Sequence, residues 1–290
     1  MTAKRKPIQK TPGYKGFYHD LTTAVKGRSK LLQWEEGKTV RLRSKAPPVP
    51  CTDKALHFCE EPSAVLQYYA PVEYGEKSKY AEVEAKGGIE RTYGKTGCKA
   101  LKIKKVFKSI WDFAKTFETV FNAVVRRIQD WTVIDSDIPI AGECNGGPIL
   151  FVAKRSAVKS YYPVLSHGSD HNLIESASLA LMLGGEQNMA VSSSCVIVRA
   201  EGDPVFAEVT SPKGIAVVLE PRYNRNCYTS RAYVRGVAGS TFIFLRSCAS
   251  PVIVKVDDEK IKAGRYYYAE IDGTVCEDKC YSSENREEAE

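Results

Sequence analysis

The amino-acid sequence predicts an α+β fold in three parts: a small N-terminal α+β module, a long amphipathic connecting helix and a C-terminal module made mainly of β-strands. Three observations support this prediction. Strand-like runs alternate with Gly and Pro over residues 13–105, apolar residues recur at helical spacing over residues 106–128, and short strand-like runs separated by Gly, Asn or Pro fill the C-terminal half.

The N-terminal module is expected to span residues 13–105, behind a disordered basic arm at residues 1–12. Pro62 stands in the first turn of a short helical segment, where the missing N–H of proline costs nothing. Three further runs are typical of strands, namely residues 15–19, 38–42 and 80–85. Short strands around one short helix predict a small α+β module.

The connecting helix is predicted over residues 106–131. Its apolar residues recur at intervals of three and four, as on one face of a helix, and they are Val106, Ile110, Phe113, Phe117, Val120, Phe121, Val124 and Ile128. Such a helix would be about 35 Å long at the standard rise. The simpler interpretation is that this face is core, because a helix this apolar has to be covered by something. The alternative is an interaction helix that contacts a partner through Trp111, Phe117 and Phe121.

The C-terminal module is expected over residues 132–280, followed by an acidic tail at residues 281–290. Strand-like runs recur about every ten residues, at 178–183, 195–198, 205–209, 215–219, 232–235 and 241–245. This recurrence is typical of stacked rungs or of a meander, so that a degenerate β-solenoid and a β-sandwich both stay open. Two last runs, closed by the turn signal Asp272-Gly273, are expected to cap the stack.

The composition is that of a globular protein, with 43% apolar and 27% charged residues. No apolar stretch follows the basic residues at the N-terminus, and none is long enough to span a bilayer, so we expect a soluble protein without membrane association. The nine cysteines are an odd number without regular spacing, which favours buried thiols and a cytoplasmic location. Cys276 and Cys280, near the tail, are either free thiols or partners in a local or inter-chain disulfide.

The net charge of +7 raises the possibility of nucleic-acid binding, because clustered cations release counterions from phosphates. The cations form two clusters: Lys4, Arg5, Lys6 and Lys10 in the N-terminal arm, and Lys99, Lys102, Lys104 and Lys105 in one strand-like segment. A mobile terminus and a solvated strand edge explain these clusters equally well, and no recognised binding motif accompanies them. Nucleic acid is therefore an unlikely partner.

Residues that could perform catalysis or hold a metal are few. The chain has four histidines, of which His167 and His171 come closest to a metal pair, but they lie in a Gly-containing segment without a Cys-x-x-Cys or His-Glu-x-x-His motif. No dinucleotide-binding, Walker or nucleophile-elbow motif is present. The sequence therefore favours a protein that binds another macromolecule, uses no cofactor and is not an enzyme.

One enzymatic alternative stays open. The order of His19, Tyr69, Glu82 and Glu84 in the N-terminal module is similar to that in ADP-ribosyltransferase folds. That resemblance implies that His19 and Tyr69 would hold the nicotinamide of NAD, while Glu82 or Glu84 would polarise the ribose. The Arg or Ser-Thr-Ser element of many such enzymes is missing, and alternating glutamates are also what any half-exposed strand displays.

A second resemblance concerns the whole chain. Motifs at residues 14–22, 56–62, 65–69 and 80–87 resemble an uncharacterised N-terminal domain of phage and prophage proteins, and residues 254–267 resemble the segment that closes those chains. The rungs between them are less regular than in that group. The architecture is similar to that of phage anti-defence proteins, in particular the inhibitors of the Gabija system. This resemblance implies a phage-encoded inhibitor in the host cytoplasm, a homo-oligomer whose C-terminal modules meet and which binds a nuclease-type defence complex stoichiometrically and blocks its access to DNA.

Overall fold

The computed structural model describes residues 9–278 except 25–30, 44–45, 93, 117–123, 129–130, 137–138, 169, 202–203, 220–230, 247–248 and 271, and of residues 124–128 it describes the backbone alone. The chain divides into two compact units. The first comprises Met1–Ala70 and Glu76–Val120, and the second comprises Pro71–Gly75 and Phe121–Glu290. Each unit is described by itself below.

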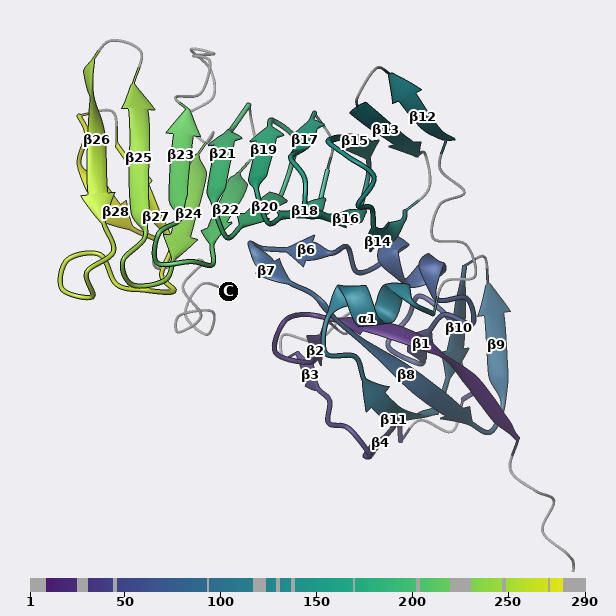
Figure 1. Cartoon of the computed structure of the whole chain (residues 1–290). Coiled ribbons are helices and arrows are strands. Elements are labelled where there is room, and N and C mark those ends of the chain that lie inside the picture. The colour runs from purple at the N-terminus through teal and green to yellow at the C-terminus, as the bar shows by residue number, and fades with distance from the viewer. Residues whose placement is uncertain are drawn as a thin grey trace, which may run out of the picture. The chain divides into compact units, whose positions relative to one another are not determined.

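The first unit contains a four-stranded antiparallel sheet in the order β1-β8-β11-β4 and a three-stranded antiparallel sheet in the order β5-β10-β9 (Figure 1). The strands are Lys10–Phe17 (β1), Thr39–Arg41 (β4), Leu56–Phe58 (β5), Lys79–Lys86 (β8), Ile89–Thr92 (β9), Lys95–Cys98 (β10) and Ala100–Val106 (β11). Short elements complete the unit: Thr22–Thr23 (β2), Leu32–Gln33 (β3), Ser63–Gln67 (a 3₁₀ helix, η1), Glu76–Lys77 (β7) and Ile110–Ala114 (α1).

One face of β8 points into the core of the first unit. Ala81, Val83 and Ala85 point into the core, where they pack with Trp34 and Leu56. The strand therefore shows the alternation of a sheet with one face toward the core.

The opposite face of β8 carries an aromatic cluster. The rings of Tyr80 and Phe113 stack with centroids 4.5 Å apart, and Phe113 also contacts Phe107 at 5.3 Å. Since Phe113 lies on α1, this short helix is held on the sheet by aromatic packing.

The predicted connecting helix over residues 106–131 is wrong. Val106 is the last residue of β11, and α1 covers only Ile110–Ala114, starting at Ser109, whose Oγ accepts a hydrogen bond from the Asp112 amide at 3.2 Å. Val124–Ile128 forms a strand, β12, which pairs antiparallel with the following strand.

The apolar spacing that predicted one helix therefore spans at least three elements, each with its own reason to be apolar. β12 is rich in β-branched residues, which favour strands, and it pairs with β13 as the edge strand of a larger sheet. Of the proposed contact residues, Trp111 is half-buried on α1. Phe117 and Phe121 lie outside the described residues.

The second unit is a two-sheeted β-solenoid (Figure 1). One sheet has nine strands. Two of them, β12 and Ala249–Lys255 (β26), are antiparallel edge strands. The other seven are parallel: Trp131–Ser136 (β13), Ile149–Ala153 (β15), Val164–His167 (β17), Leu179–Leu183 (β19), Cys195–Arg199 (β21), Ile215–Leu219 (β23) and Thr241–Arg246 (β25). The other sheet has eight: Ala141–Glu143 (β14), Ala157–Ser160 (β16), Leu173–Ser176 (β18), Asn188–Ser192 (β20), Val205–Val209 (β22), Ala232–Gly236 (β24), Tyr267–Ala269 (β27) and Val275–Glu277 (β28). Val72–Glu73 (β6) also belongs to this unit.

A buried polar ladder sets the spacing of the coils. The Ser156 Oγ accepts from the amide of Ile140 at 3.0 Å, the Asn172 Oδ1 accepts from the amide of Ser156 at 3.0 Å, and the Asn188 Oδ1 accepts from the amide of Asn172 at 2.8 Å. Each step of this ladder advances 16 residues along the chain. At this corner each side chain therefore satisfies a buried N–H of the preceding coil, which an apolar side chain could not do.

These elements correct the predicted fold class. The described residues contain one α-helix of five residues and one 3₁₀ helix, so the protein is almost entirely β rather than α+β. Of the two C-terminal architectures that the sequence left open, the structure has the solenoid, because consecutive strands alternate between two parallel sheets. Among the described residues, no helix combines the length and the apolar character needed to cross a membrane.

Candidate functional site

The outer face of the nine-stranded sheet is the candidate functional site. Alternate residues of its strands point into the solenoid, where Phe151, Met182, Val196 and Phe242 are fully buried. The residues between them point outward and are again apolar, which is unusual for a sheet whose second face meets solvent. We call these outward residues of β15 to β26 the apolar sheet face.

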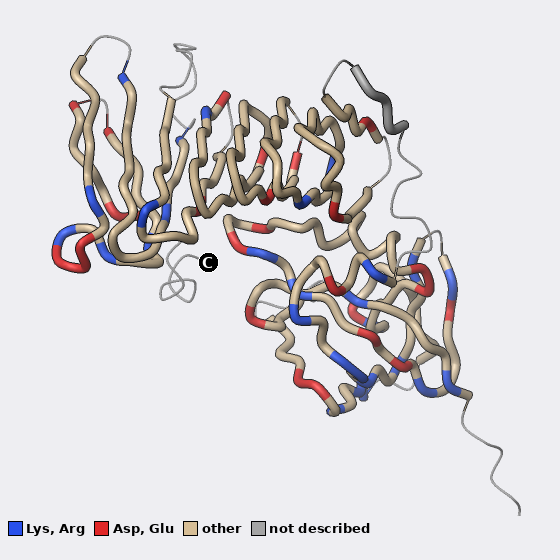
Figure 2. The backbone as a smooth tube through the Cα atoms, viewed as in Figure 1, with Lys and Arg blue, Asp and Glu red and all other residues tan. Residues whose placement is uncertain are grey.

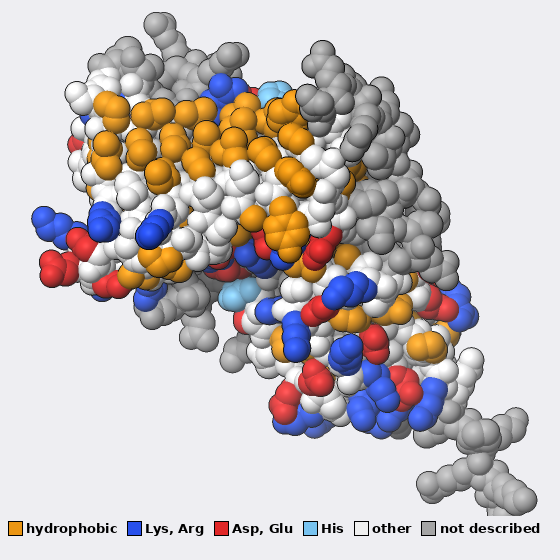
Figure 3. Space-filling view, viewed as in Figure 1, with side chains coloured by type: hydrophobic (Ala, Val, Ile, Leu, Met, Phe, Trp, Pro, Cys, Tyr) orange, Lys and Arg blue, Asp and Glu red, His pale blue; other side chains and the backbone are white. Residues whose placement is uncertain are grey.

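Seven residues form the central row of this face. The register pairs each with the next across neighbouring strands, in the order Leu150, Leu165, Leu181, Ile197, Val217, Ile243 and Ile253. A second row contains Leu179, Cys195 and Ile215 in register. In the space-filling view, hydrophobic side chains gather in orange bands across the solenoid (Figure 3). The apolar surface is therefore continuous over seven strands.

The face is open to solvent to a substantial degree. Ile253 is 65% exposed, and Val152, Ile215 and Leu245 are also exposed. The other six members of the central row are half-buried, because neighbouring side chains in a sheet shield one another. A contiguous apolar surface of this kind marks an interaction site more often than an ordinary surface.

The corresponding row of the other sheet is covered by the chain itself. Leu173, Met189 and Phe206 point outward from successive strands of that sheet and are fully buried. The backbone of Gly75 lies against Phe206 so closely that a Cβ at Gly75 would stand 2.6 Å from the ring, and the Tyr266 hydroxyl donates to the Gly75 carbonyl at 2.6 Å. One apolar row of the solenoid is thus buried, whereas that of the nine-stranded sheet is left exposed.

Charged residues are sparse on the apolar sheet face. In Figure 2 the middle strands of the nine-stranded sheet are largely free of charge, and β15, β19 and β23 contain no charged residue. Arg199, Arg246 and Lys255 lie outside the central row, at strand ends. By contrast, the outer face of the second sheet carries the ion pairs Lys159–Glu175 at 3.1 Å and Arg235–Glu208 at 3.2 Å.

Burial raises the pKa of the Cys195 thiol, which belongs to the second row of the apolar sheet face. The thiol is therefore protonated at neutral pH and contributes to the surface as a small apolar group.

The residues of the ADP-ribosyltransferase alternative lie in the first unit. Glu82 and Glu84 are on the face of β8 opposite the core, and Glu84 forms an ion pair with Lys10 at 3.7 Å. Tyr69 packs against Gly16 of β1, and its carbonyl accepts from the Tyr80 hydroxyl at 3.1 Å. On the same face, Tyr14 and Tyr80 pack against Phe113.

The other candidate groups are dispersed. His19 follows β1 on a part-exposed turn, and the His167 and His171 imidazoles lie near two different carboxylates, Glu201 at 4.0 Å and Glu73 at 3.9 Å. Within the described ranges, no three His, Cys, Asp or Glu side chains are grouped as metal ligands. Cys276 is half-buried on β28. Cys280 lies outside the described residues, so the pairing of these two cysteines stays a prediction.

The apolar sheet face was not among the residues singled out from the sequence. A signal for it exists, because Leu165, Leu181 and Ile197 of the central row follow one another at intervals of 16 residues, the same interval as in the polar ladder. The spacing of 20 residues to Val217 then breaks the repeat.

Comparison with known proteins gives one match. Residues 11–116 match the model of a domain of unknown function (DUF7666). These residues cover most of the first unit, from within β1 to just past α1, together with Pro71–Gly75 of the second unit. Neither the curated proteins nor the solved structures include a match to this chain. The match does not extend to the strands of the solenoid, which begin at β12.

Proposed function

We propose that this protein acts by binding, as a homo-oligomer whose solenoids pair through the apolar sheet face. The observation that carries this proposal is the central row of seven aliphatic residues, in register across seven strands, of which Ile253 is exposed and the others are half-buried. Removing such a row from water is favourable at about 25 cal/mol per Å² of apolar surface.

The size of the face fits a stable interface. Seven strands at about 4.8 Å spacing extend over about 34 Å, and three outward residues per strand cover about 17 Å in the other direction. The projected area is therefore about 600 Å², and the accessible area of the protruding side chains is larger, which approaches the roughly 800 Å² per partner of a standard interface.

A second copy of the chain suits this face better than a charged partner does. Parallel strands in register form a flat surface, and two such surfaces can pack face to face at about 10 Å with interdigitating side chains. A two-fold axis would place the apolar rows of both copies against each other and leave Arg199 and Lys255 near the rim. A nucleic acid would find no cation in the central row and only Arg199, Arg246 and Lys255 at the strand ends.

Sedimentation of the full chain with substituted faces tests the pairing. We expect the wild-type protein to sediment as a dimer or larger species at micromolar concentration, and Ile197→Lys and Leu181→Lys to sediment as monomers with unchanged circular dichroism. Tyr161→Lys is the matched control, because Tyr161 is 70% exposed in a turn of the same solenoid outside the apolar sheet face. A monomeric wild-type protein, or lysine variants that still associate, would contradict the proposal.

The target of the oligomer is proposed from the sequence resemblance to phage anti-defence proteins. We propose that the oligomer binds a bacterial defence complex of the nuclease type, with the first unit available for that contact. The test is infection of bacteria that carry the Gabija system. Expression of this protein should restore plaque formation by a sensitive phage, and an unchanged efficiency of plating would refute this choice of target while leaving the pairing of the solenoids to be judged by sedimentation.

A further inference from the structure

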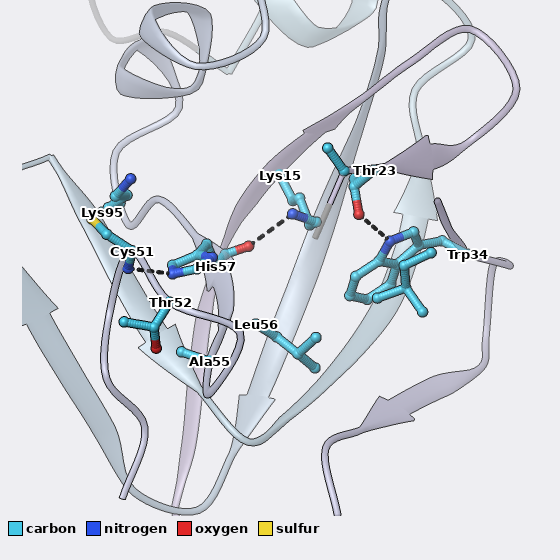
Figure 4. A pocket seen from close by; sticks show the side chains of 11 residues that line it. Lys15, Thr23, Trp34, Cys51, Thr52, Ala55, Leu56, His57 and Lys95 are labelled. Atoms are coloured by element: carbon cyan, nitrogen blue, oxygen red, sulfur yellow. Dashed lines mark hydrogen bonds between the residues drawn. The ribbon is translucent and has the colours of Figure 1, made fainter. Parts of the chain in front are cut away.

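A cavity of about 360 Å³ lies within the first unit, apart from the apolar sheet face. Its lining comes from β1, β2, β3, β5 and β10 and from residues 51–55. Figure 4 shows the Lys15, His57, Thr23 and Trp34 side chains around it, and Lys95 completes the polar lining. The volume is within the range of about 300–1,000 Å³ that small-molecule sites occupy.

Lys15 is the unusual residue of this cavity. It is only 7% exposed, because it points from β1 into the space between the two sheets. Its Nζ donates to the His57 carbonyl at 3.0 Å and lies 5.3 Å from the centre of the Trp34 ring. An ammonium group has three N–H donors, and among the described residues no carboxylate is within ion-pair distance of Lys15. The buried cation thus keeps donor capacity toward the cavity.

The surroundings of Lys15 add positive charge and donors. Lys95 also lines the cavity, and none of the residues that line it is Asp or Glu. The His57 Nε2 accepts from the Cys51 amide at 2.8 Å, which leaves Nδ1 as the protonated nitrogen of a neutral imidazole. The Thr23 Oγ1 accepts from the Trp34 Nε1 at 2.9 Å, so its own proton is available to another acceptor.

The pKa values agree with this description. Burial, aided by the nearby Lys95, lowers the pKa of Lys15 to about 8. Burial, together with the charges of Lys15 and Lys95, lowers the pKa of His57 to about 4. Both shifts are those of cations in a site that lacks a counter-charge.

We propose that this cavity binds a small organic anion, whose carboxylate or phosphate oxygens contact Lys15 and Lys95 and whose flat apolar body lies against Trp34 and Leu56. The apolar part of the lining, with Leu32 and Ala55, gives such a body its contact surface. The anionic group supplies the counter-charge that the described residues do not, and the donors of His57 and Thr23 fix its orientation.

Calorimetric titration of the full chain with matched probes tests the proposal. Adenosine monophosphate represents the phosphates and indole-3-acetate the carboxylates, with adenosine and indole-3-acetamide as neutral counterparts. We expect at least one anion to bind, and its neutral counterpart to bind at least about tenfold more weakly. Binding of neither anion at millimolar concentration, or equal binding of the neutral counterpart, overturns the proposal.

Three variants locate the site. Lys95→Met and Lys15→Met should each weaken binding of the anion at least about tenfold, whereas Lys104→Met, an exposed position on β11 outside the cavity, should leave it unchanged. If Lys15→Met does not fold, the affinity of Lys95→Met tests the site instead, because the Lys95 side chain is only part-buried and its replacement should not unfold the protein. Wild-type affinity in Lys95→Met would place the anion elsewhere and refute the assignment.

Discussion

Replacing Lys15 with methionine removes a cation from the interior of the first unit, and the change should appear as a loss of pH dependence in its stability. Lys15 is almost fully buried, and burial lowers its pKa from the ordinary 10.5 to about 8. Between these two values the unfolded chain binds a proton that the folded chain releases. The free energy of unfolding therefore rises with pH over this window.

The magnitude follows from the two pKa values. Their difference corresponds to about 3 kcal/mol at 1.36 kcal/mol per pH unit, present in full above about pH 10 and lost as the pH falls to about 8. Lys15→Met should lack this increment. Its lost hydrogen bond to the His57 carbonyl costs about 1 kcal/mol at every pH, so it changes the level of the curve and not its slope.

The assay is urea unfolding between about pH 7 and about pH 10, followed by tryptophan fluorescence, which Trp34 reports from beside Lys15. Because other lysines and tyrosines titrate in the same window, the quantity to compare is the difference between wild type and Lys15→Met. Lys104→Met serves as the exposed control. Parallel curves for wild type and Lys15→Met would show that Lys15 is not desolvated in the way the structure indicates.

Three more outcomes follow from other sites. Asn172→Ala should lower the free energy of unfolding by about 2–4 kcal/mol, because it removes the hydrogen-bond partner of the Ser156 amide and of the Ala153 carbonyl in the solenoid. The control Asn145→Ala, at an exposed corner, should lower it by less than about 1 kcal/mol, and urea unfolding measures both variants. The affinity of the anion probe should fall about tenfold per pH unit above about pH 8, as Lys15 loses its proton, and a constant affinity would contradict its role. Alkylation of Cys195 should slow as the protein concentration rises, whereas that of the exposed Cys51 should not, and mass spectrometry of the labelled peptides measures both.

The C-terminal strands could be predicted from sequence, because runs such as Leu179–Leu183 and Cys195–Arg199 are short, mostly apolar and preceded by Ser. Their assignment to two sheets could not. Strands of one coil belong to different sheets, so the strand-to-strand interval of about ten residues hides the coil length that Ser156, Asn172 and Asn188 mark.

The prediction of a connecting helix was wrong for a related reason. Val106, Ile110 and Phe113 satisfy helical spacing but sit at the end of a strand and on a five-residue helix, each packed by separate tertiary contacts. Periodicity alone does not reveal a boundary between elements, and only the cap at Ser109 marks where this helix begins.

The candidate sites depend on tertiary structure that no local pattern contains. A fully apolar strand such as Leu179–Leu183 is expected to be buried on both faces, and its sequence does not show that one face is left open. Lys15 likewise has the sequence context of an exposed strand residue. Its burial results from the approach of β5, which carries Leu56 and His57.

The most direct test of the paired solenoids is photo-crosslinking from the apolar sheet face. With p-benzoylphenylalanine at Ile215 in one isotopically labelled population and unlabelled wild-type chains in excess, crosslinks between copies can be assigned by mass spectrometry. Face-to-face pairing predicts that they fall on the outward residues of β17 to β25 of the other copy. Crosslinks confined to the same copy, or between copies but directed to the first unit, would contradict it.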